Sequence, residues 1–324
     1  MTRSLLIAAA FGLLALSPLA AWLFDDPFLV TLLTRVVILA LAAVALDLVL
    51  GYGGLVSLGH AAFLGIGAYT AGILASHAFD GSAFMSWPFE IGGSAQALVT
   101  WPLAMLTGGL LAAVLAPICL RTAGVHFIMI TLAFAQMLYY FFISLPRYGG
   151  EDGLVLFARA EFPGLDLGDD VTFFYLCLVL LGGYFLLARR LVAARLGMVL
   201  RGAKQNPGRM AALGFPLRRY QLAVYAISGA GTALAGALQA ELDLFVSPTL
   251  LSWHQSGELV VIVLLGGMGT LIGPVFGAAA LVLLEEVLGR FTEHWMFVLG
   301  PILVLVALFS RRGLLGWLEA RLSR

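Results

Sequence analysis

Four polar side chains stand in apolar stretches of the sequence, and their chemistry suits contact with a polar solute: Ser57, His60, Thr131 and Gln136. Hydroxyl, imidazole and amide groups can all donate and accept hydrogen bonds. Because burial of such groups is costly, they are either satisfied inside the fold or face a path that a polar molecule takes. These four residues are our candidates for a translocation pathway.

The residue types that catalysis or metal binding needs are not grouped in this chain. Cys119 and Cys177 each lie inside an apolar run, which favours a packing role over a disulfide or a metal cluster. The acidic residues fall in predicted loops or near the ends of predicted helices, so no nucleophile or carboxylate pair is indicated. We expect a protein that is not an enzyme and binds no metal.

The composition indicates a membrane protein. With 61% hydrophobic and 11% charged residues and a mean hydropathy of +1.02, the 324-residue chain has too little polar surface for a water-soluble globule. Since about 20 apolar residues cross a bilayer, the sequence predicts an all-α polytopic membrane protein with about ten transmembrane helices, some short or broken. The expected spans are 4–24, 28–50, 60–79, 97–120, 125–145, 171–188, 220–240, 256–265, 271–288 and 294–309. The first also resembles a signal peptide, because ALSPLAA offers a cleavage site, but a polytopic chain commonly uses its first span for insertion.

Basic and acidic residues gather in different predicted loops. Segment 189–219 holds eight of the 18 basic residues and no acid, whereas loop 146–170 holds six acids and only two arginines. Lysine and arginine stay preferentially in the cytoplasm, so the first is predicted to be cytoplasmic and the second periplasmic. Basic residues near both chain ends predict cytoplasmic N and C termini. Six expected spans precede the basic segment, and an even number must follow it if the C terminus is also cytoplasmic. A total of ten spans meets this condition, and a total of nine does not.

Glycines recur in two segments, GYGGLVSLGHAAFLGIGAYTAG (51–72) and LLGGMGTLIGP (264–274). Small residues let helix backbones approach closely in lipid, where the hydrophobic effect does not bring helices together. Glycine-interrupted helices can also mark a transport path. The glycines that we assign to helix packing or helix breaks are Gly53, Gly54, Gly59, Gly67, Gly266, Gly267, Gly269 and Gly273.

Charged residues inside the predicted spans are few. Arg35 and Asp47 share one span but lie about 18 Å apart at 1.5 Å per residue, too far to pair. We expect Arg35 to face a neighbouring subunit and Asp47 to extend its carboxylate to the cytoplasmic membrane surface. Glu285 and Glu286 are interpreted as interfacial anchors.

The basic segment contains the signature of a short surface helix. Asn206 suits the N-cap, Pro207 the first position and Gly214 the end, so residues 207–213 are predicted to be helical. Such a helix could dock a soluble partner. The chain's only lysine, Lys204, is followed by Gln205, and the sequence has no phosphate-binding loop. Any nucleotide-driven work must therefore come from another subunit.

Four segments resemble the LivM-type permease family of branched-chain amino acid ABC importers, in order and at the family's separations. They are GYGGLVSLGHAAFLGIGAYTAG, GVHFIMITLAFAQM with GGEDGL after it, QNPGRMAALGFPLRRYQLAVYAISGAGTALAGAL, and FVSPTLLSWHQSGELVVIVLLGGMGTLIGPVFGA. The likeness covers residues 43–313. Several independent motifs make it specific.

The resemblance implies a single transmembrane permease domain, residues 1–324, in a bacterial inner membrane. The implied partners are a second, LivH-like permease, two ATP-binding subunits that carry ATP and Mg²⁺, and a periplasmic solute-binding protein. No cofactor bound by this chain and no nucleic acid are implied. The segment that would enter a groove on the ATPase comprises Lys204, Gln205, Asn206, Pro207, Arg209, Met210, Leu213 and Gly214. Gln205 departs from the acidic residue that the family often has there, which weakens the case for a specific salt bridge at this position.

The sequence leaves alternatives for the substrate and for the energy source of transport. Branched-chain and other apolar amino acids are favoured by the resemblance, while urea, short amides or aromatic acids are the substrates of related importers. An ion-coupled secondary carrier would also have glycine-broken helices, but it needs a titratable group at the membrane midplane. The sequence offers no central acidic residue for that role.

Overall fold

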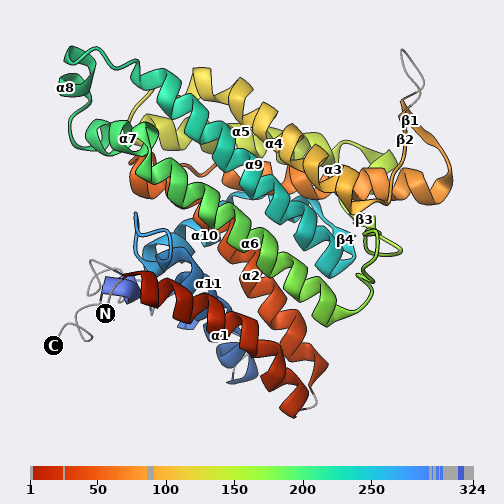
Figure 1. The fold of residues 1–324 in the computed structure, drawn as a ribbon. Helices are drawn as coiled ribbons and strands as arrows, with labels where there is room; N and C mark the ends of the chain where they lie inside the picture. The colour runs from red at the N-terminus through yellow and green to blue at the C-terminus, as the bar shows by residue number, and fades with distance from the viewer. Residues whose placement is uncertain are drawn as a thin grey trace.

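Long helices run between the two ends of the molecule, and short connections join them there (Figure 1). The computed structural model describes residues 3–24, 26–85, 91–291, 294, 297–298, 300–301 and 313–316. The helices are α1 (Arg3–Phe24), α2 (Pro27–Asp47), α3 (His60–Asp80), α4 (Ala97–Cys119), α5 (Val125–Ile143), α6 (Asp170–Ala193), α7 (Arg195–Gln205), α8 (Pro207–Ala212), α9 (Leu217–Asp243), α10 (Trp253–Gly266) and α11 (Gly273–Phe291), with a π-helix, η1 (Leu48–Tyr52), and two 3-10 helices, η2 (Pro146–Tyr148) and η3 (Pro248–Leu251). The predicted all-α class is confirmed.

The strands are short and lie at one end of the molecule, opposite α7 and α8 (Figure 1). β1 (Ala83–Met85) pairs antiparallel with β2 (Ile91–Gly92), and β3 (Leu154–Val155) pairs antiparallel with β4 (Phe245–Val246). The second pair joins loop 146–170 to the end of α9. It therefore fixes part of the acidic loop against the helical bundle.

In the part of the chain that the structure describes, six helices are long and apolar enough to cross a membrane: Pro27–Tyr52, His60–Asp80, Ala97–Cys119, Val125–Ile143, Asp170–Ala193 and Leu217–Asp243. Each corresponds to a span expected from the sequence. α1, α10 and α11 correspond to three further expected spans, but the described apolar part of α1 is Leu6–Leu19 and α10 has only 14 residues. The tenth expected span, 294–309, lies largely outside the described residues.

α9 packs against α2, α3 and α4 through small residues. A Cβ atom at Gly67 of α3 would collide with the backbone carbonyl of Ala233, and one at Gly236 would collide with that of Leu64. The α3 and α9 backbones thus approach to a distance that only glycine permits. Dispersion contacts over this interface stabilise the bundle without any need for a hydrophobic driving force.

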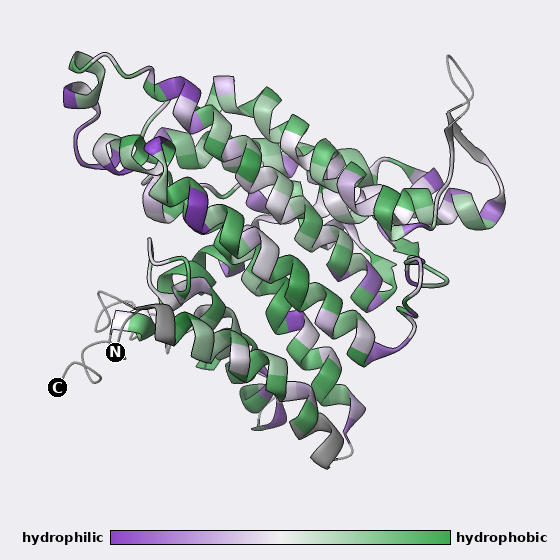
Figure 2. Cartoon of the chain, viewed as in Figure 1, coloured by the Kyte–Doolittle hydropathy of each residue, from purple (hydrophilic) through white to green (hydrophobic). Residues whose placement is uncertain are grey.

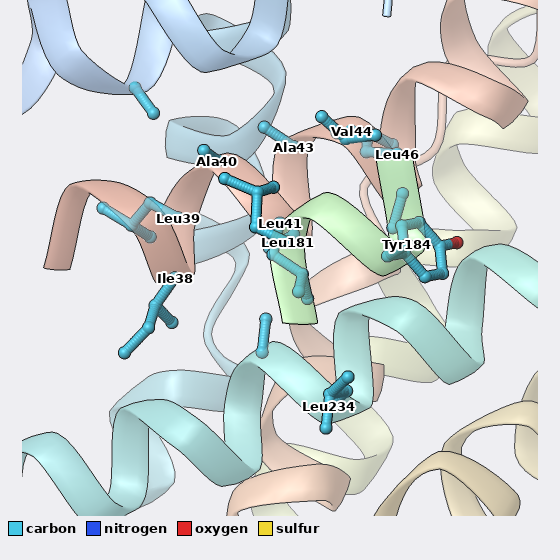
Figure 3. Packing of buried hydrophobic residues seen from close by; sticks show 14 of the residues in the cluster. Ile38, Leu39, Ala40, Leu41, Ala43, Val44, Leu46, Leu181, Tyr184 and Leu234 are labelled. Atoms are coloured by element: carbon cyan, nitrogen blue, oxygen red, sulfur yellow. The ribbon is translucent and has the colours of Figure 1, made fainter. Parts of the chain in front are cut away.

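α2 is buried around its whole circumference over residues 36–46. Leu41 and its neighbours meet Leu181 and Tyr184 of α6 on one side and Leu234 of α9 on another (Figure 3). A helix that is apolar all round is typical of the centre of a membrane bundle. α2 is therefore the central helix of the bundle, and the polar sites described below include residues at its end.

Hydrophilic residues gather toward the two ends of the helices, and hydrophobic residues cover the middle (Figure 2). α6 begins directly after the acidic loop 146–170 and ends in the basic segment 189–219. Since 24 helical residues extend about 36 Å, the acidic and basic surfaces lie at opposite ends of the bundle. The start of α1 lies toward the end that carries α7 and α8 (Figure 1).

Candidate translocation and coupling elements

The two glycine-rich breaks lie against each other. After α2, the chain passes through η1 and then through Gly53 and Gly54 into a non-helical stretch that ends at α3. A Cβ atom at Gly51 would collide with the backbone nitrogen of Gly269, in the turn between α10 and α11. The φ angles of Gly54 (69°) and Gly269 (75°) are in the left-handed region that favours glycine. We call this contact the glycine junction, residues 51–54 and 266–273.

Asp47 holds the glycine junction together. Its Oδ1 accepts the backbone N–H of Gly269 at 2.7 Å, and its Oδ2 accepts that of Leu271 at 3.2 Å. The residue is fully buried. The expectation that Asp47 extends to the membrane surface is therefore wrong, because two unpaired N–H groups of the neighbouring turn attract the carboxylate inward.

Lys204 reaches the glycine junction from α7. Its Nζ donates a hydrogen bond of 2.7 Å to the carbonyl oxygen of Gly51. Its methylene chain lies against Gly54, where a Cβ atom would approach Lys204 Cγ to 2.8 Å. The lysine that begins the predicted coupling segment thus binds within its own chain.

The predicted short helix is present as α8, and it ends one residue earlier than expected. Asn206 Oδ1 accepts the backbone N–H of Arg209 at 2.9 Å, Pro207 occupies the first turn, and Gly214 has a φ of 83°. Met210 packs on α7, since a Cβ atom at Gly202 would approach its Sδ to 2.7 Å.

The segment that contains α8 is exposed apart from Met210. Leu213 is 65% exposed, and Gln205, Asn206, Pro207, Arg209 and Gly214 are also exposed. Leu213 therefore gives this surface its apolar contact point.

His60 is fully buried in a polar network at the start of α3. Its Nδ1 lies 3.1 Å from Ser57 Oγ, and its Nε2 lies 2.9 Å from Ser228 Oγ of α9. Tyr225 OH lies 3.3 Å from Ser57 Oγ, and Ser228 Oγ donates to the carbonyl oxygen of Ala45 at 2.6 Å. The network thus links α2, α3 and α9.

The carbonyl oxygen of Ala45 fixes the direction of the hydrogen bonds at Ser228, and a neutral His60 fixes the direction of the others. Because a carbonyl oxygen only accepts, the Ser228 hydroxyl donates its hydrogen bond to Ala45. Ser228 Oγ must therefore accept a hydrogen bond from His60 Nε2. Nδ1 of a neutral His60 then accepts from the hydroxyl of Ser57, and Tyr225 OH donates to Ser57 Oγ. All members are satisfied when His60 is neutral, which gives His60 a structural role in the network.

Thr131 joins the same region from α5, and Gln136 does not. Thr131 Oγ1 accepts the N–H of Leu58 at 3.2 Å, and a Cβ atom at Gly59 would approach the Thr131 carbonyl oxygen to 3.0 Å. Ser57, His60 and Thr131 are all buried, whereas Gln136 is half-buried and its Nε2 has no hydrogen-bond partner among the described residues. The structure therefore brings three of the four pathway candidates together and leaves the fourth with an unused donor.

Arg35 forms an ion pair that sequence reasoning missed. Its Nη2 lies 3.2 Å from Glu285 Oε2, and the Glu285 side chain is only 13% exposed. The interpretation of Glu285 as an interfacial anchor is therefore corrected, whereas Glu286 pairs with Arg290 one turn away. Arg35, Glu285 and Glu286 line a cavity of about 700 Å³ between α2, α10 and α11. No spacing in the sequence relates Arg35 to Glu285, because they are 250 residues apart.

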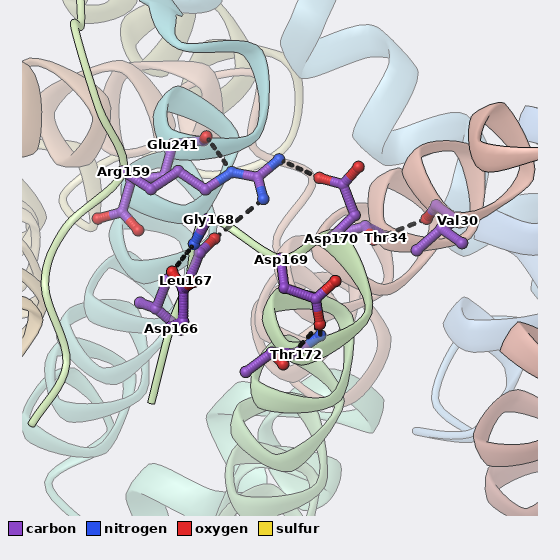
Figure 4. A network of polar contacts seen from close by, with 10 residues as sticks. All are labelled: Val30, Thr34, Arg159, Asp166, Leu167, Gly168, Asp169, Asp170, Thr172 and Glu241. Atoms are coloured by element: carbon purple, nitrogen blue, oxygen red, sulfur yellow. Dashed lines mark hydrogen bonds and ion pairs between the residues drawn. The ribbon is translucent and has the colours of Figure 1, made fainter. Parts of the chain in front are cut away.

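Arg159 organises the acidic loop (Figure 4). Its guanidinium donates to Asp170 Oδ1 at 2.6 Å, to the Leu167 carbonyl oxygen at 3.0 Å and to the Glu241 carbonyl oxygen at 3.3 Å. It also stacks over the ring of Phe173, 4.7 Å from the centroid. These contacts hold the loop between the ends of α6 and α9.

Comparisons of the sequence with known proteins identify a family. The model of the family "branched-chain amino acid transport system / permease component" matches residues 28–307. The high-affinity branched-chain amino acid transport system permease protein LivM of Escherichia coli K12 is 29% identical over 94% of this chain and 74% of its own length, and LivM of Salmonella typhimurium LT2 is 28% identical over 89% and 71%. No solved structure matches. The chain therefore belongs to the family of permease components of branched-chain amino acid transport systems.

Proposed function

We propose that this chain is the membrane permease subunit of an ABC importer that moves branched-chain or related apolar amino acids across the bacterial inner membrane. A periplasmic solute-binding protein would deliver the amino acid, and a LivH-like second permease and two ATP-binding subunits would complete the complex. The observation that carries the proposal is the family match over residues 28–307. The names of the LivM relatives support the substrate class.

The proposed orientation places α7 and α8 in the cytoplasm and loop 146–170 in the periplasm. The charges of these two surfaces support it, because basic residues stay preferentially inside. The exposed segment around α8 would then be the docking surface for an ATP-binding subunit. Both chain termini are proposed to be cytoplasmic.

The coupling route that we propose runs from α8 to the glycine junction. Met210 packs on Gly202 of α7, and Lys204 of α7 binds the carbonyl oxygen of Gly51. Asp47 then ties that segment to the turn between α10 and α11. A partner that binds α8 differently in two states would bias the position of the whole junction, since only such a difference in affinity shifts a conformational equilibrium.

The pathway role of Ser57, His60, Thr131 and Gln136 stays a prediction. The fixed direction of the His60 hydrogen bonds favours an ATP-driven permease over an ion-coupled carrier, because a histidine that carries protons must change its hydrogen-bond partners. The amide nitrogen of Gln136 has no hydrogen-bond partner among the described residues, so it could donate a hydrogen bond to a polar solute.

Reconstitution with the partner subunits tests the proposal. Proteoliposomes that contain the complete complex should accumulate labelled leucine only when ATP and the binding protein are both supplied. A complex whose ATP-binding subunits are catalytically inactive is the matched control and should not accumulate leucine. Uptake driven by an ion gradient without ATP would contradict the proposal, and ATP-dependent uptake of urea in place of leucine would overturn its substrate class.

A further inference from the structure

A second cavity, of about 220 Å³, lies beside the acidic loop at the end of the molecule opposite α8. α3 provides one wall with small side chains, among them Ala71 and Ala75, and residues 155–161 of the loop provide another. We call it the outer cavity. Binding sites for drug-sized molecules are about 300–1,000 Å³, so the outer cavity suits a smaller solute.

Glu241 of α9 lines the outer cavity with an unpaired carboxylate oxygen. The residue is 2% exposed, and its Oε1 accepts the indole N–H of Trp101 at 2.7 Å. Its Oε2 is buried and has no hydrogen-bond partner among the described residues. Arg159 acts on this carboxylate only through space, since its guanidinium bonds to the Glu241 backbone carbonyl and pairs with Asp170 (Figure 4). A buried carboxylate without a hydrogen-bonded counter-charge is costly, so a cationic group that bonds to Glu241 would stabilise it.

The rest of the lining defines what kind of cation fits. The described residues contain no group of three side chains suited to hold a metal ion. Beside Glu241, the cavity is lined by Arg159, Glu161, the hydroxyl-bearing Ser76 and Thr100, and otherwise by apolar residues. An ammonium group on a small apolar molecule satisfies both the carboxylate and the apolar walls.

The loop wall contains backbone N–H groups without a backbone acceptor among the described residues. The N–H groups of Leu156 and Glu161 bond to the carbonyl oxygens of Leu244 and Ala95. Between them, the N–H groups of residues 157–160 donate to no other backbone group in the described part of the chain. A carboxylate could accept from these groups, near the positive charge of Arg159, while an ammonium on the same molecule meets Glu241.

Two exposed aromatic rings stand at the rim of the outer cavity. Phe79 and Phe157 are 66% and 68% exposed, and their rings stack with centroids 4.2 Å apart. They join the end of α3 to the loop that forms the far wall. An apolar solute that enters the cavity would pass this pair.

We propose that the outer cavity is a receiving site in the permease for a zwitterionic apolar α-amino acid, with the substrate ammonium on Glu241 and its side chain against α3. This inference rests on the proposed function, because it names where the permease first holds the substrate of that import. It also assigns part of the selectivity to this chain: a solute without an ammonium group leaves Glu241 unpaired.

The test uses the complete complex in nanodiscs, without ATP and without binding protein, so that only sites in the membrane subunits are probed. Saturation-transfer NMR would measure binding of leucine and of 4-methylpentanoate, which is leucine without its amino group. The wild type should bind leucine and should bind 4-methylpentanoate at least tenfold more weakly. In Glu241→Gln the preference for leucine should disappear, because the variant keeps an oxygen for Trp101 but has lost the charge.

Glu151→Gln is the matched control, since it makes the same chemical change at an exposed acid of the same loop that does not line the outer cavity. It should keep the preference for leucine. Ala75→Leu gives a second, independent variant that leaves Glu241 in place and narrows the cavity, and it should weaken leucine binding. Equal leucine preference in the wild type and in Glu241→Gln would overturn the inference, as would unchanged binding in Ala75→Leu.

Transport by the same complexes reconstituted in proteoliposomes separates the two proposals. If the wild type imports leucine with ATP and binding protein but its membrane subunits bind no leucine, the outer cavity is not a receiving site and the proposed function stands. If the wild type imports urea and not leucine, the proposed substrate class fails, and the receiving site fails with it.

Discussion

Asp47 and Gly269 are joined by a hydrogen bond of 2.7 Å across 222 residues of sequence, from the end of α2 to the turn between α10 and α11. The same carboxylate also accepts the N–H of Leu271. One buried side chain therefore supplies the acceptors that this turn cannot find in its own backbone. The glycine junction depends on that supply.

Replacing Asp47 by alanine should destabilise the permease strongly. Two buried N–H groups would lose their acceptors, at about 1–3 kcal/mol for each. Asp26→Ala is the control, because it removes an exposed helix cap, worth about 1 kcal/mol, from the other end of α2. Thermal unfolding of the purified complex would measure both. Equal losses in the two variants would show that the Asp47 hydrogen bonds contribute no more than a surface cap.

Gly67→Ala should impair folding of this chain even before it meets a partner permease. The added methyl group would collide with the Ala233 backbone at the contact between α3 and α9. Gly183→Ala is the matched control, since a Cβ atom at that helical position meets nothing within 4 Å. The yield of folded permease, expressed alone and measured by size-exclusion chromatography, should fall for the first variant only. Normal yield of Gly67→Ala would show that the two backbones separate at little cost.

Leu213→Asp should weaken docking of the ATP-binding subunit without affecting the fold. Leu213 is 65% exposed, so a charge there costs little until the surface is buried in a complex. Met210→Asp would be a less specific test, because Met210 packs on Gly202 within the chain. Copurification of the ATP-binding subunit and leucine-stimulated ATP hydrolysis would both drop.

Arg218→Ala is the control for docking, because it lies in the first turn of α9, outside the segment around α8. It should retain copurification and coupled hydrolysis. Full coupling in Leu213→Asp would exclude this surface as the docking site.

The first turn of α6 should loosen in acid. Asp169 caps that turn by accepting from the hydroxyl and the backbone N–H of Thr172, at 2.7 and 3.0 Å, and the hydroxyl bond in particular lowers the pKa of the Asp169 carboxyl below its usual 3.8. A depressed folded pKa means that the stabilisation is present at neutral pH and is lost as the pH falls through that pKa. The hydrogen-exchange protection factor of the turn, which corrects for the intrinsic effect of pH, should therefore fall below a pH of about 4 in the wild type. Asp169→Asn should show no such pH dependence, and a wild-type profile in that variant would contradict the assignment.

The helices could be predicted from the sequence because a bilayer demands an apolar stretch of a fixed length, and that demand acts locally along the chain. α3, α4 and α5 begin at the residues that the apolar pattern indicates. The partners of the charged residues could not be predicted. Arg35 and Glu285 meet only because α2 and α11 pack together, and no local pattern encodes that contact.

In the candidate site, too, local features could be predicted from the sequence and contacts between distant residues could not. The cap of α8 could be inferred from Asn206, because a cap is a contact between residues three positions apart. Ser57 and His60 could be selected as candidates because they are polar residues in apolar stretches, and the structure places them in one polar cluster. The roles of Ser228 and Tyr225 in that cluster follow from the packing of α9 on α3, which brings residues 168 positions apart into contact.

The fixed hydrogen-bond direction around His60 also bears on the electrical integrity of the membrane. A row of hydroxyl and imidazole groups inside a bilayer can conduct protons if each group can pass one on and then turn to receive the next. Here the row ends at the Ala45 carbonyl oxygen, which has no proton to pass on and takes none. The row therefore does not conduct protons. The polar contacts can hold three helices together while the proton gradient across the membrane is preserved.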